Sequence, residues 1–472
     1  MSASRKDIEN RVISFWDEAI LPTLTEYIRI PNQSPGFDKD WRKNGHMAKA
    51  VELVRRWVEA QQVPGLTLRV LEDGGRTPLL LCDIPGDLKN EVLIYGHLDK
   101  QPPMTGWRKH LGPWKPVYEK GKLYGRGGAD DGYSIFAAIA VVKMMKSLGL
   151  PHGHIRILIE CSEESGSSDL AHYLSAYAKA IGKPELVVCL DSGCGDYARL
   201  WSTTSLRGIV SATVRVKILR EGVHSGMAGG IVPNPIQIMR MLLERLEDPG
   251  TGRLRPEALH VEIPPARIEQ AKRAAAVLGG AVTEAFPLVK GGRALAGSPQ
   301  QLLLNGTWEP AMTVISQSGL PELGAGGNVL LPEVAFRLSL RIPPTLSPRE
   351  ASATLRKLLE QDPPFGAQVS VSAGGLPGWN APEESPWLAE ATDAASREFF
   401  GHPSCYFGIG GSIPFMDMIG KKFPKAQFLI TGVLGPNSNA HGPNEFLHVP
   451  YAKKLTCCLM RVLEAHYFHH QG

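Results

Sequence analysis

Long hydrophobic runs are missing from this sequence of 472 residues. No stretch of about 18 uncharged apolar residues occurs, so we expect no helix that spans a membrane. Residues 1–20 mix charged and isolated apolar side chains, and we expect no signal peptide there. Clustered basic charge is missing too, because the formal net charge is only +4 and the lysines and arginines are scattered. We therefore expect neither a membrane partner nor a nucleic-acid partner.

Cysteine is scarce as well. The seven cysteines are an odd number, and their spacing matches neither a zinc knuckle nor a disulfide framework. Cys82, Cys161 and Cys189 stand inside apolar runs, where a cysteine usually behaves as a small buried hydrophobe. A reducing cytoplasm is the simplest compartment for such a chain.

The hydrophobic pattern indicates an α/β protein, and the length favours two domains. Short apolar runs typical of buried strands lie at residues 77–84, 91–95, 154–159, 185–190 and 427–431. Stretches with helical period lie at residues 133–148, 169–181 and 451–466. Strands that alternate with helices of this length predict βαβ units and a mostly parallel sheet.

The middle of the chain has a different pattern. Residues 208–218 alternate between apolar and polar side chains, as in a strand with one face in water. The other elements expected here are strands at 312–317, 334–342 and 368–372 and helices at 235–246 and 348–359. Their β-α-β-β-α-β order predicts a small sheet with helices on one face. We expect this α+β domain at residues 205–376, with residues 248–309 as an insertion, between two parts of an α/β domain, residues 1–204 and 377–472.

Acidic residues and histidines follow the ends of the predicted strands. Those that do so are His97, Glu163, Glu164, Asp191 and His441. Asp130 stands just before the helix predicted from residue 133. In open α/β sheets, ligands bind at the carboxyl ends of the strands, so these side chains are expected to converge. Each residue alone would more often be a surface or packing side chain, and only their joint occurrence indicates a site.

Imidazole and carboxylate groups in this combination indicate a metal centre. They are ligands of zinc, or of manganese where carboxylates dominate. Two divalent cations about 3.5 Å apart need a bridging carboxylate, and a carboxylate that is not a ligand must take a proton from the attacking water. Asp99 stands two residues after His97 in an extended segment, so it is expected to orient the imidazole.

Four segments resemble the signature blocks of the M20 metallopeptidases. They are YGHLDKQP from Tyr95, LYGRGGADD from Leu123, ECSEESG from Glu160 and GGSIP from Gly410. The resemblance is strongest to the carnosinase and cytosolic non-specific dipeptidase branch, and it covers nearly the whole chain. It implies a two-metal catalytic domain and an inserted domain that serves as lid and dimerisation surface.

The resemblance also implies metal ligands. His97 and Asp191 match the ligands of one metal, and Glu164 and His441 match those of the other. Asp130 matches the bridging carboxylate.

Further roles follow from the same resemblance. Glu163 matches the general base, and the peptide bond from the bridging aspartate to Asp131 is expected to be cis. The pattern departs after this aspartate pair, where many members have Lys-Gly and this chain has Gly132 and Tyr133. That departure concerns substrate detail rather than the metal site.

Several substrate contacts are implied in addition. His224 matches a histidine that, in dimeric members, reaches the partner subunit's active site and stabilises the oxyanion, so a homodimer is expected. Asn328 resembles a second such contact, and Arg341 resembles a partner for a substrate carboxylate. Backbone N–H groups at Gly411 and Ser412, ahead of a predicted helix, are expected to hold an anionic group.

Two other patterns are not expected to form sites. The glycine-rich residues 125–128 lack the Lys-Ser/Thr pair of a phosphate loop, and the acidic pair after them would repel phosphate. His466, His469 and His470 are expected to form a frayed helix end rather than a metal site.

The leading hypothesis is a cytoplasmic, homodimeric hydrolase with two zinc or manganese ions that cleaves dipeptides or short peptides. An N-acyl-amino-acid amidohydrolase would use the same centre and stays open as an alternative. A non-catalytic binding protein is the third hypothesis, although such a relative would be expected to have lost a ligand or the base, and all six positions are present.

Overall fold

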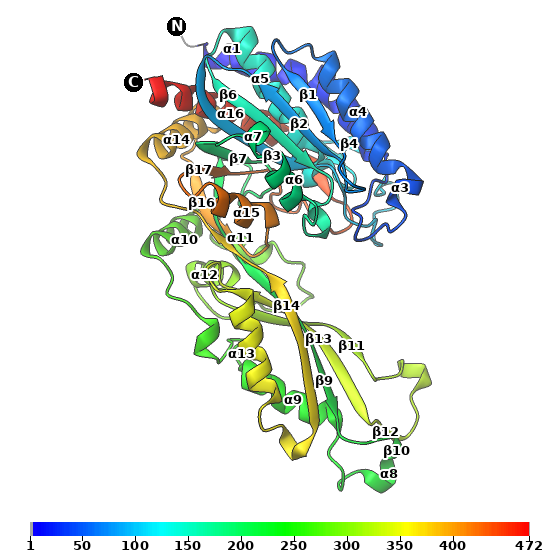
Figure 1. Ribbon diagram of the computed structural model, residues 1–472. Coiled ribbons are helices and arrows are strands. Elements are labelled where there is room, and N and C mark those ends of the chain that lie inside the picture. The colour runs from blue at the N-terminus through cyan, green and yellow to red at the C-terminus, as the bar shows by residue number, and fades with distance from the viewer. Residues whose placement is uncertain (1–2, 472) are drawn as a thin grey trace. The chain divides into compact units, whose positions relative to one another are not determined.

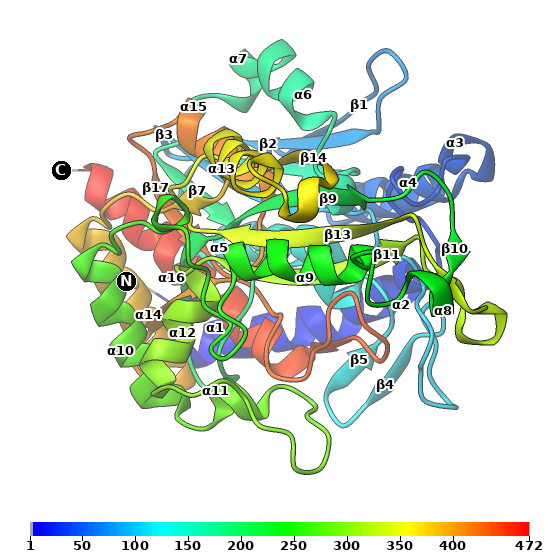
Figure 2. The same ribbon diagram turned by 90° about the horizontal axis from the view of Figure 1, so that it is seen from below.

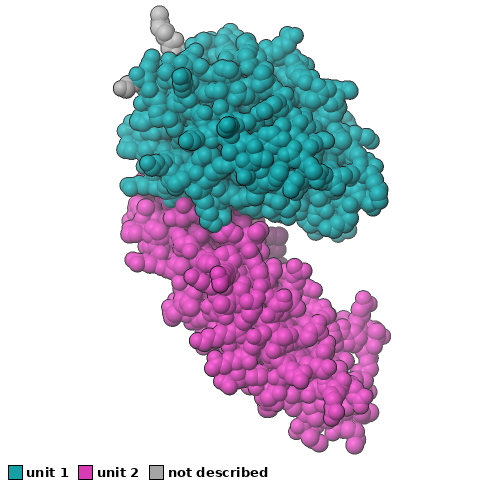
Figure 3. Space-filling model, viewed as in Figure 1, with its two compact units in different colours: residues 1–204, 381–407, 414–472 teal, residues 205–380, 408–413 magenta. Residues whose placement is uncertain are grey.

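The computed structural model describes residues 3–471 and divides into two compact units, coloured separately in Figure 3. Unit 1 comprises Met1–Thr204, Ala381–Phe407 and Pro414–Gly472, and unit 2 comprises Ser205–Asn380 and Gly408–Ile413. All seven cysteines are free and buried, as predicted for three of them. Among the described residues, no helix is both long and apolar enough to cross a membrane.

The main sheet of unit 1 has six strands in the order β1-β2-β6-β3-β7-β17. Their bounds are β1 Thr67–Leu71, β2 Leu79–Ile84, β3 Leu88–His97, β6 Gly153–Glu160, β7 Leu186–Cys189 and β17 Gln427–Ile430. The last four are parallel, which confirms the predicted mostly parallel sheet. β2 instead runs antiparallel to β6. Only residues 85–87 join β2 to β3, too few for the crossover that parallel strands require.

Helices cover both faces of this sheet. Their bounds are α1 Arg5–Phe15, α2 Leu21–Ile28, α3 Trp41–Asn44, α4 His46–Ala60, α5 Tyr133–Leu148, α6 Leu170–Ala176, α7 Ala178–Ile181, α14 Pro386–Phe400, α15 Pro414–Lys422 and α16 Val449–Gln471. Figures 1 and 2 show α5 and α16 on one side of the sheet and α6, α7 and α15 on the other. α5 is apolar on all sides, and 12 of its 16 residues are buried.

Two predictions about helices in unit 1 were wrong. The single helix expected at residues 169–181 is interrupted at Tyr177, whose φ of −109° and ψ of 25° are not helical. The histidines near residue 470 are not a frayed end, because α16 continues to Gln471 and His466 is fully buried. The frayed end was expected because His-rich ends are often exposed, and only the packing of α16 decides otherwise.

Short strands complete unit 1. β4 (Val117–Glu119), β5 (Lys122–Tyr124) and β18 (Phe446–His448) form an antiparallel sheet in the order β18-β5-β4. β18 pairs with β5 across more than 300 residues of sequence, which brings the two loops that carry Asp130 and His441 to the same place. Three other strands lie where the chain passes from one unit to the other in the sequence. They are β8 (Trp201–Leu206), β15 (Trp379–Asn380) and β16 (Cys405–Ile409).

Unit 2 contains the predicted β-α-β-β-α-β arrangement. The elements are β9 Gly208–Lys217, α9 Pro235–Leu246, β11 Ala311–Ser318, β13 Glu333–Ile342, α13 Pro348–Glu360 and β14 Gln368–Leu376. The sheet is antiparallel in the order β11-β13-β9-β14. Alternate residues of β9 and β13 pack with α9 and α13 in one apolar core, so both helices cover the same face.

The insertion within unit 2 is largely helical. It contains α10 (Pro265–Leu278), α11 (Ala281–Glu284) and α12 (Pro299–Thr307), where α10 and α12 share a small apolar cluster. Two very short strands, β10 (Val223–His224) and β12 (Val329–Leu330), pair with each other, and α8 (Ser225–Ala228) follows β10.

Candidate metal centre

The four parallel strands end at one edge of the sheet, and the candidate residues follow them. His97 is the last residue of β3 and pairs in register with Glu160, the last residue of β6. Glu163 and Glu164 follow β6 in a short turn, and Asp191 comes two residues after β7. The shared edge therefore brings together residues that are far apart in the sequence.

His97, Asp130 and Asp191 form a first group of possible metal ligands. The Nε2 atom of His97 lies 3.5 Å from Asp130 Oδ1 and 3.7 Å from Asp191 Oδ1. All three side chains are buried, and one ligand atom of each lies within 4.8 Å of the others. His97 Nε2 has no hydrogen-bond partner among residues 3–471. A cation between these atoms would supply that partner.

Asp130, Glu164 and His441 form a second group. His441 Nε2 lies 3.1 Å from Asp130 Oδ2 and 3.2 Å from Glu164 Oε2. Asp130 thus presents Oδ1 to His97 and Oδ2 to His441. A carboxylate shared in this way is what a site for two cations about 3.5–4 Å apart requires. The peptide bond between Asp130 and Asp131 is cis, as the sequence resemblance implied.

Acidic side chains are in excess at this edge of the sheet. Burial, followed by the charge of Asp130, raises the pKa of Glu164 to about 7, and burial also raises the pKa of Asp191. Burial alone would lower the pKa of His441, but Asp130 and Glu164 outweigh it and raise that pKa to about 11. Bound divalent cations would favour the ionised carboxylates again. The donor set therefore fits two cations of the zinc or manganese type.

Glu163 lies beside the two groups and belongs to neither. Burial, and then the negative charge of Asp191, raise the pKa of Glu163 well above its usual value. The backbone N–H groups of Glu163 and Glu164 donate to the Asp99 carboxylate at 3.1 and 3.0 Å. Asp99 also lies next to His97, whose Nδ1 is 3.1 Å from the Asp99 carbonyl and 3.5 Å from Asp99 Oδ1. One aspartate thus holds both the imidazole and the turn with the two glutamates.

Known proteins share the sequence features that build this centre. The sequence model described as Peptidase family M20/M25/M40 matches residues 93–465, a span that contains both ligand groups and Glu163. The chain belongs to this peptidase family. The resemblance seen in four short sequence segments is thereby confirmed.

Relatives of this M20 peptidase include dipeptidases. It is 26% identical over 374 residues to the cysteinylglycine-S-conjugate dipeptidase of Corynebacterium striatum, which covers 77% of this chain and 79% of that protein. It is 24% identical over 463 residues to the Beta-Ala-His dipeptidase of Homo sapiens, with coverages of 92% and 87%. The solved structure of the di-peptidase Dug1p from Saccharomyces cerevisiae has the same fold, with a TM-score of 0.77, 20% identity and coverage of 98% of this chain and 99% of that chain.

A buried ion pair connects two loops of the peptidase's candidate centre. Its Arg126 lies in the second sequence block, but no motif marks its partner, Glu445. Arg126 Nη1 lies 2.5 Å from Glu445 Oε2, and both side chains are buried. Arg126 Nη2 donates to the carbonyls of His441 and Gly442 at 2.9 and 2.8 Å. Glu445 Oε1 accepts from the backbone N–H of Asp130 at 3.4 Å. The pair therefore positions candidate ligands from opposite ends of the chain.

Two further contacts around the centre were not predicted, although Gln101 and Asp131 lie in the first and second sequence blocks. Asp131 Oδ2 accepts a hydrogen bond from the backbone N–H of His97 at 3.1 Å, and Gln101 Nε2 donates to Glu164 Oε2 at 2.6 Å. Gly96 is required for the first contact, because a Cβ there would lie 2.6 Å from Asp131 Oδ2. The sequence signals for this close approach were the positions of Gly96 in the first block and of Asp131 in the second.

His224 and Asn328 are neighbours in unit 2. β10, which ends at His224, pairs with β12, and the N–H of Ser225 donates to the Asn328 carbonyl at 2.9 Å. The His224 ring is exposed, and its Nδ1 accepts from the N–H of Gly226 at 3.1 Å. Its Nε2 atom has no partner within the described part of the chain.

Arg341, on β13, lies close to Arg207, which no sequence pattern marks. Burial, and then the charge of Arg341, lower the pKa of Arg207 to about 10, and burial also lowers the pKa of Arg341. No carboxylate of residues 3–471 forms an ion pair with either guanidinium. The Ser412 hydroxyl, next to Gly411, donates to the Arg207 carbonyl at 2.6 Å. Two guanidinium groups without a counter-ion are suited to bind an anion.

Proposed function

We propose that this peptidase is a dipeptidase that uses two divalent cations, zinc or manganese, to cleave the amide bond of dipeptides and short peptides. The observation that carries the proposal is the position of Asp130, whose two oxygens face two separate histidines. We assign His97 and Asp191 to one cation and Glu164 and His441 to the other, with Asp130 between them. The dipeptidases among its relatives support a peptide substrate.

Glu163 is the general base in this proposal. When bound, the two cations polarise the scissile carbonyl and make water more acidic. Glu163, which belongs to neither ligand group, accepts the proton of the attacking water and donates it to the leaving amine nitrogen. Asp99 supports this role because it holds the backbone of the turn that carries Glu163.

Unit 2 supplies the substrate contacts in this proposal. Arg341, with Arg207 beside it, binds the carboxylate of the substrate, assisted by the backbone N–H groups at Gly411 and Ser412. The absence of a carboxylate partner for either guanidinium within residues 3–471 supports this assignment.

We further propose that the chain forms a homodimer through unit 2, which would serve as lid and dimerisation domain. His224, with Asn328 next to it, would stabilise the oxyanion in the partner subunit's active site. The exposed ring of His224 and its unpartnered Nε2 support this role.

A substrate panel tests the function. Protein supplied with zinc or with manganese is offered dipeptides, tripeptides, N-acetyl amino acids and N-succinyl amino acids, and kcat/KM is measured for each. We expect dipeptides to give the highest value. Faster hydrolysis of the N-acyl amino acids would favour an amidohydrolase instead, and no cleavage of any amide by metal-replete protein would contradict both functions.

Arg341→Ala tests the substrate carboxylate. We expect kcat/KM to fall roughly 10- to 100-fold for dipeptides, because a hydrogen bond to a charged group is lost. C-terminally amidated dipeptides should show no such loss. Arg337→Ala is the matched control, since Arg337 lies on the same strand and is exposed. An equal loss with both kinds of substrate would rule out the assigned role.

A further inference from the structure

A second cluster of metal-ligating side chains lies at the other end of β7. Glu185 directly precedes this strand, whereas Asp191 of the candidate metal centre follows it. An extended chain rises about 3.3 Å per residue, so these two residues are about 20 Å apart. The second cluster therefore cannot share a cation with the first.

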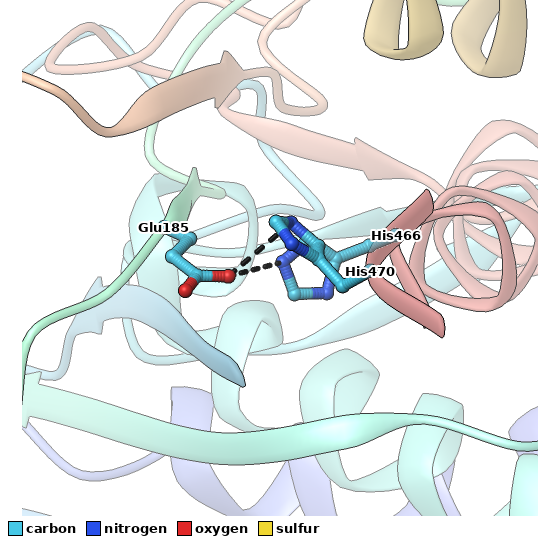
Figure 4. A group of neighbouring side chains, drawn as sticks. All are labelled: Glu185, His466 and His470. Carbon is cyan, nitrogen blue, oxygen red and sulfur yellow. Dashed lines mark ion pairs between the residues drawn. The ribbon is translucent and has the colours of Figure 1, made fainter. Parts of the chain in front are cut away.

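His466 and His470 face Glu185 from α16. They are four residues apart on the helix, so their rings lie on the same side. Figure 4 shows both rings pointing towards the carboxylate of Glu185. His470 Nε2 lies 3.2 Å and His466 Nε2 lies 3.9 Å from Glu185 Oε2. Two ligands at about 2.1 Å from a tetrahedral zinc ion are about 3.4 Å apart, so this spacing suits atoms around one cation.

His466 provides a second, independent observation. Its side chain is only 1% exposed, and its Nε2 atom has no hydrogen-bond partner among residues 3–471. Its Nδ1 atom lies 3.4 Å from the side-chain amide of Asn90, which leaves Nε2 as the nitrogen that faces Glu185. The 3.9 Å to Glu185 is too long for a hydrogen bond. A buried nitrogen without a partner is unfavourable, and a cation would satisfy it.

An ion pair between His470 and Glu185 alone would explain only part of the geometry of this cluster. It accounts for the 3.2 Å distance but leaves His466 Nε2 without a partner. His469, the neighbouring histidine, is not part of the cluster, because its ring stacks on Trp387 at 5.2 Å with an interplanar angle of 18°. The three histidines near this helix end therefore have different environments.

We propose that Glu185, His466 and His470 bind one transition-metal ion of the zinc, nickel or copper type. Two imidazoles and a carboxylate are a typical donor set for such ions, with water in the remaining positions. The ion would connect the start of β7 to the last turns of α16. This site is independent of the proposed dipeptidase function, because none of its residues belongs to the candidate metal centre.

Metal content tests the proposal. Wild-type protein and variants are dialysed against buffer with the same free zinc concentration, and bound zinc per chain is measured by mass spectrometry. We expect His470→Ala and Glu185→Gln to bind one equivalent less than the wild type, whatever number the candidate metal centre holds. These two variants are chosen because both side chains are at the surface, whereas loss of the buried His466 ring would endanger folding.

His469→Ala is the matched control. It removes a histidine from the same turns of α16 and should bind as much zinc as the wild type. Zinc should also raise the melting temperature of the wild type and of His469→Ala by more than that of His470→Ala. Equal zinc content in His470→Ala, Glu185→Gln and the wild type would overturn the proposal. An equal loss in His469→Ala and His470→Ala would overturn it too, since it would indicate unspecific binding by terminal histidines.

Discussion

The two ends of β7 carry clusters of the same residue types that differ in charge and in the burial of their carboxylates. The ligand groups at the carboxyl end have three carboxylates for two imidazoles, and Asp130 is shared between the two groups. The amino end has one carboxylate for two imidazoles, and its Glu185 side chain is 46% exposed. Buried like charges gain most from divalent cations. A shared, buried carboxylate, rather than the mere presence of histidine and acid, would therefore distinguish the proposed two-metal centre from the proposed single-ion site.

Asp130→Ala is the substitution for which we expect the largest loss of metal binding and of activity. It removes the only residue common to both ligand groups, so both cations should bind more weakly and dipeptide hydrolysis should fall more than about 10,000-fold. Metal content after dialysis and kcat/KM measure the two effects. Asp40→Ala, at an exposed acid, should change neither. If Asp130→Ala kept two metals, the interpretation of Asp130 as a shared ligand would be wrong.

Glu163→Gln should have the next largest effect and should separate the base from the ligands. We expect the metals to stay bound while kcat falls roughly 100- to 10,000-fold, the usual range for loss of a general base. Glu164→Gln is the comparison, because it should lose metal as well as activity. Near wild-type turnover by metal-replete Glu163→Gln would show that Glu163 is not the general base.

Arg126→Ala tests how much the buried ion pair beside the candidate metal centre contributes to the stability of the protein. The substitution leaves Glu445 buried without its partner, so the free energy of unfolding should fall by about 3–5 kcal/mol. Arg5→Ala breaks an exposed pair with Glu9 and should cost less than about 1 kcal/mol. Urea unfolding measures both. Equal losses would show that burial of the first pair contributes nothing.

The smallest effect on activity is expected when the first metal ion is removed in a stepwise titration with a chelator. The ion proposed at Glu185, His466 and His470 should leave first, because its single carboxylate is 46% exposed whereas those of the candidate metal centre are buried. Activity should change less than about twofold at this step, since distant sites act independently. Hydrolysis should stop only when the remaining metal is removed. A proportional loss of activity with the first equivalent of metal removed would show that the most weakly bound ion takes part in hydrolysis, contrary to this prediction.

Local sequence patterns were sufficient to predict five of the six strands of the main sheet, all but β1, and the convergence of the candidate ligands. Strands β3, β6, β7 and β17 are apolar runs, and parallel strands share one carboxyl edge, so residues that follow them must lie together. α5 was predicted with its observed bounds, because residues 133–148 have helical period and are mostly apolar. The family blocks then distinguished Glu163 from Glu164, which spacing alone does not.

Features that depend on pairing across the chain could not be predicted. Arg126 and Glu445 are 319 residues apart, and no local pattern connects them. Burial of His466 depends on how α16 packs, so the sequence suggested an exposed end instead. Arg207 becomes a neighbour of Arg341 only through the sheet of unit 2. The lid and dimerisation role of unit 2, and its limits at residues 205–376, stay predictions.

Anomalous diffraction from zinc-soaked crystals tests the two-metal centre most directly. We predict two peaks about 3.5–4 Å apart at the carboxyl ends of β3, β6, β7 and β17, with the Asp130 carboxylate bound to both. A single peak there, or two peaks that Asp130 does not bridge, would show that the proposed two-metal centre is wrong.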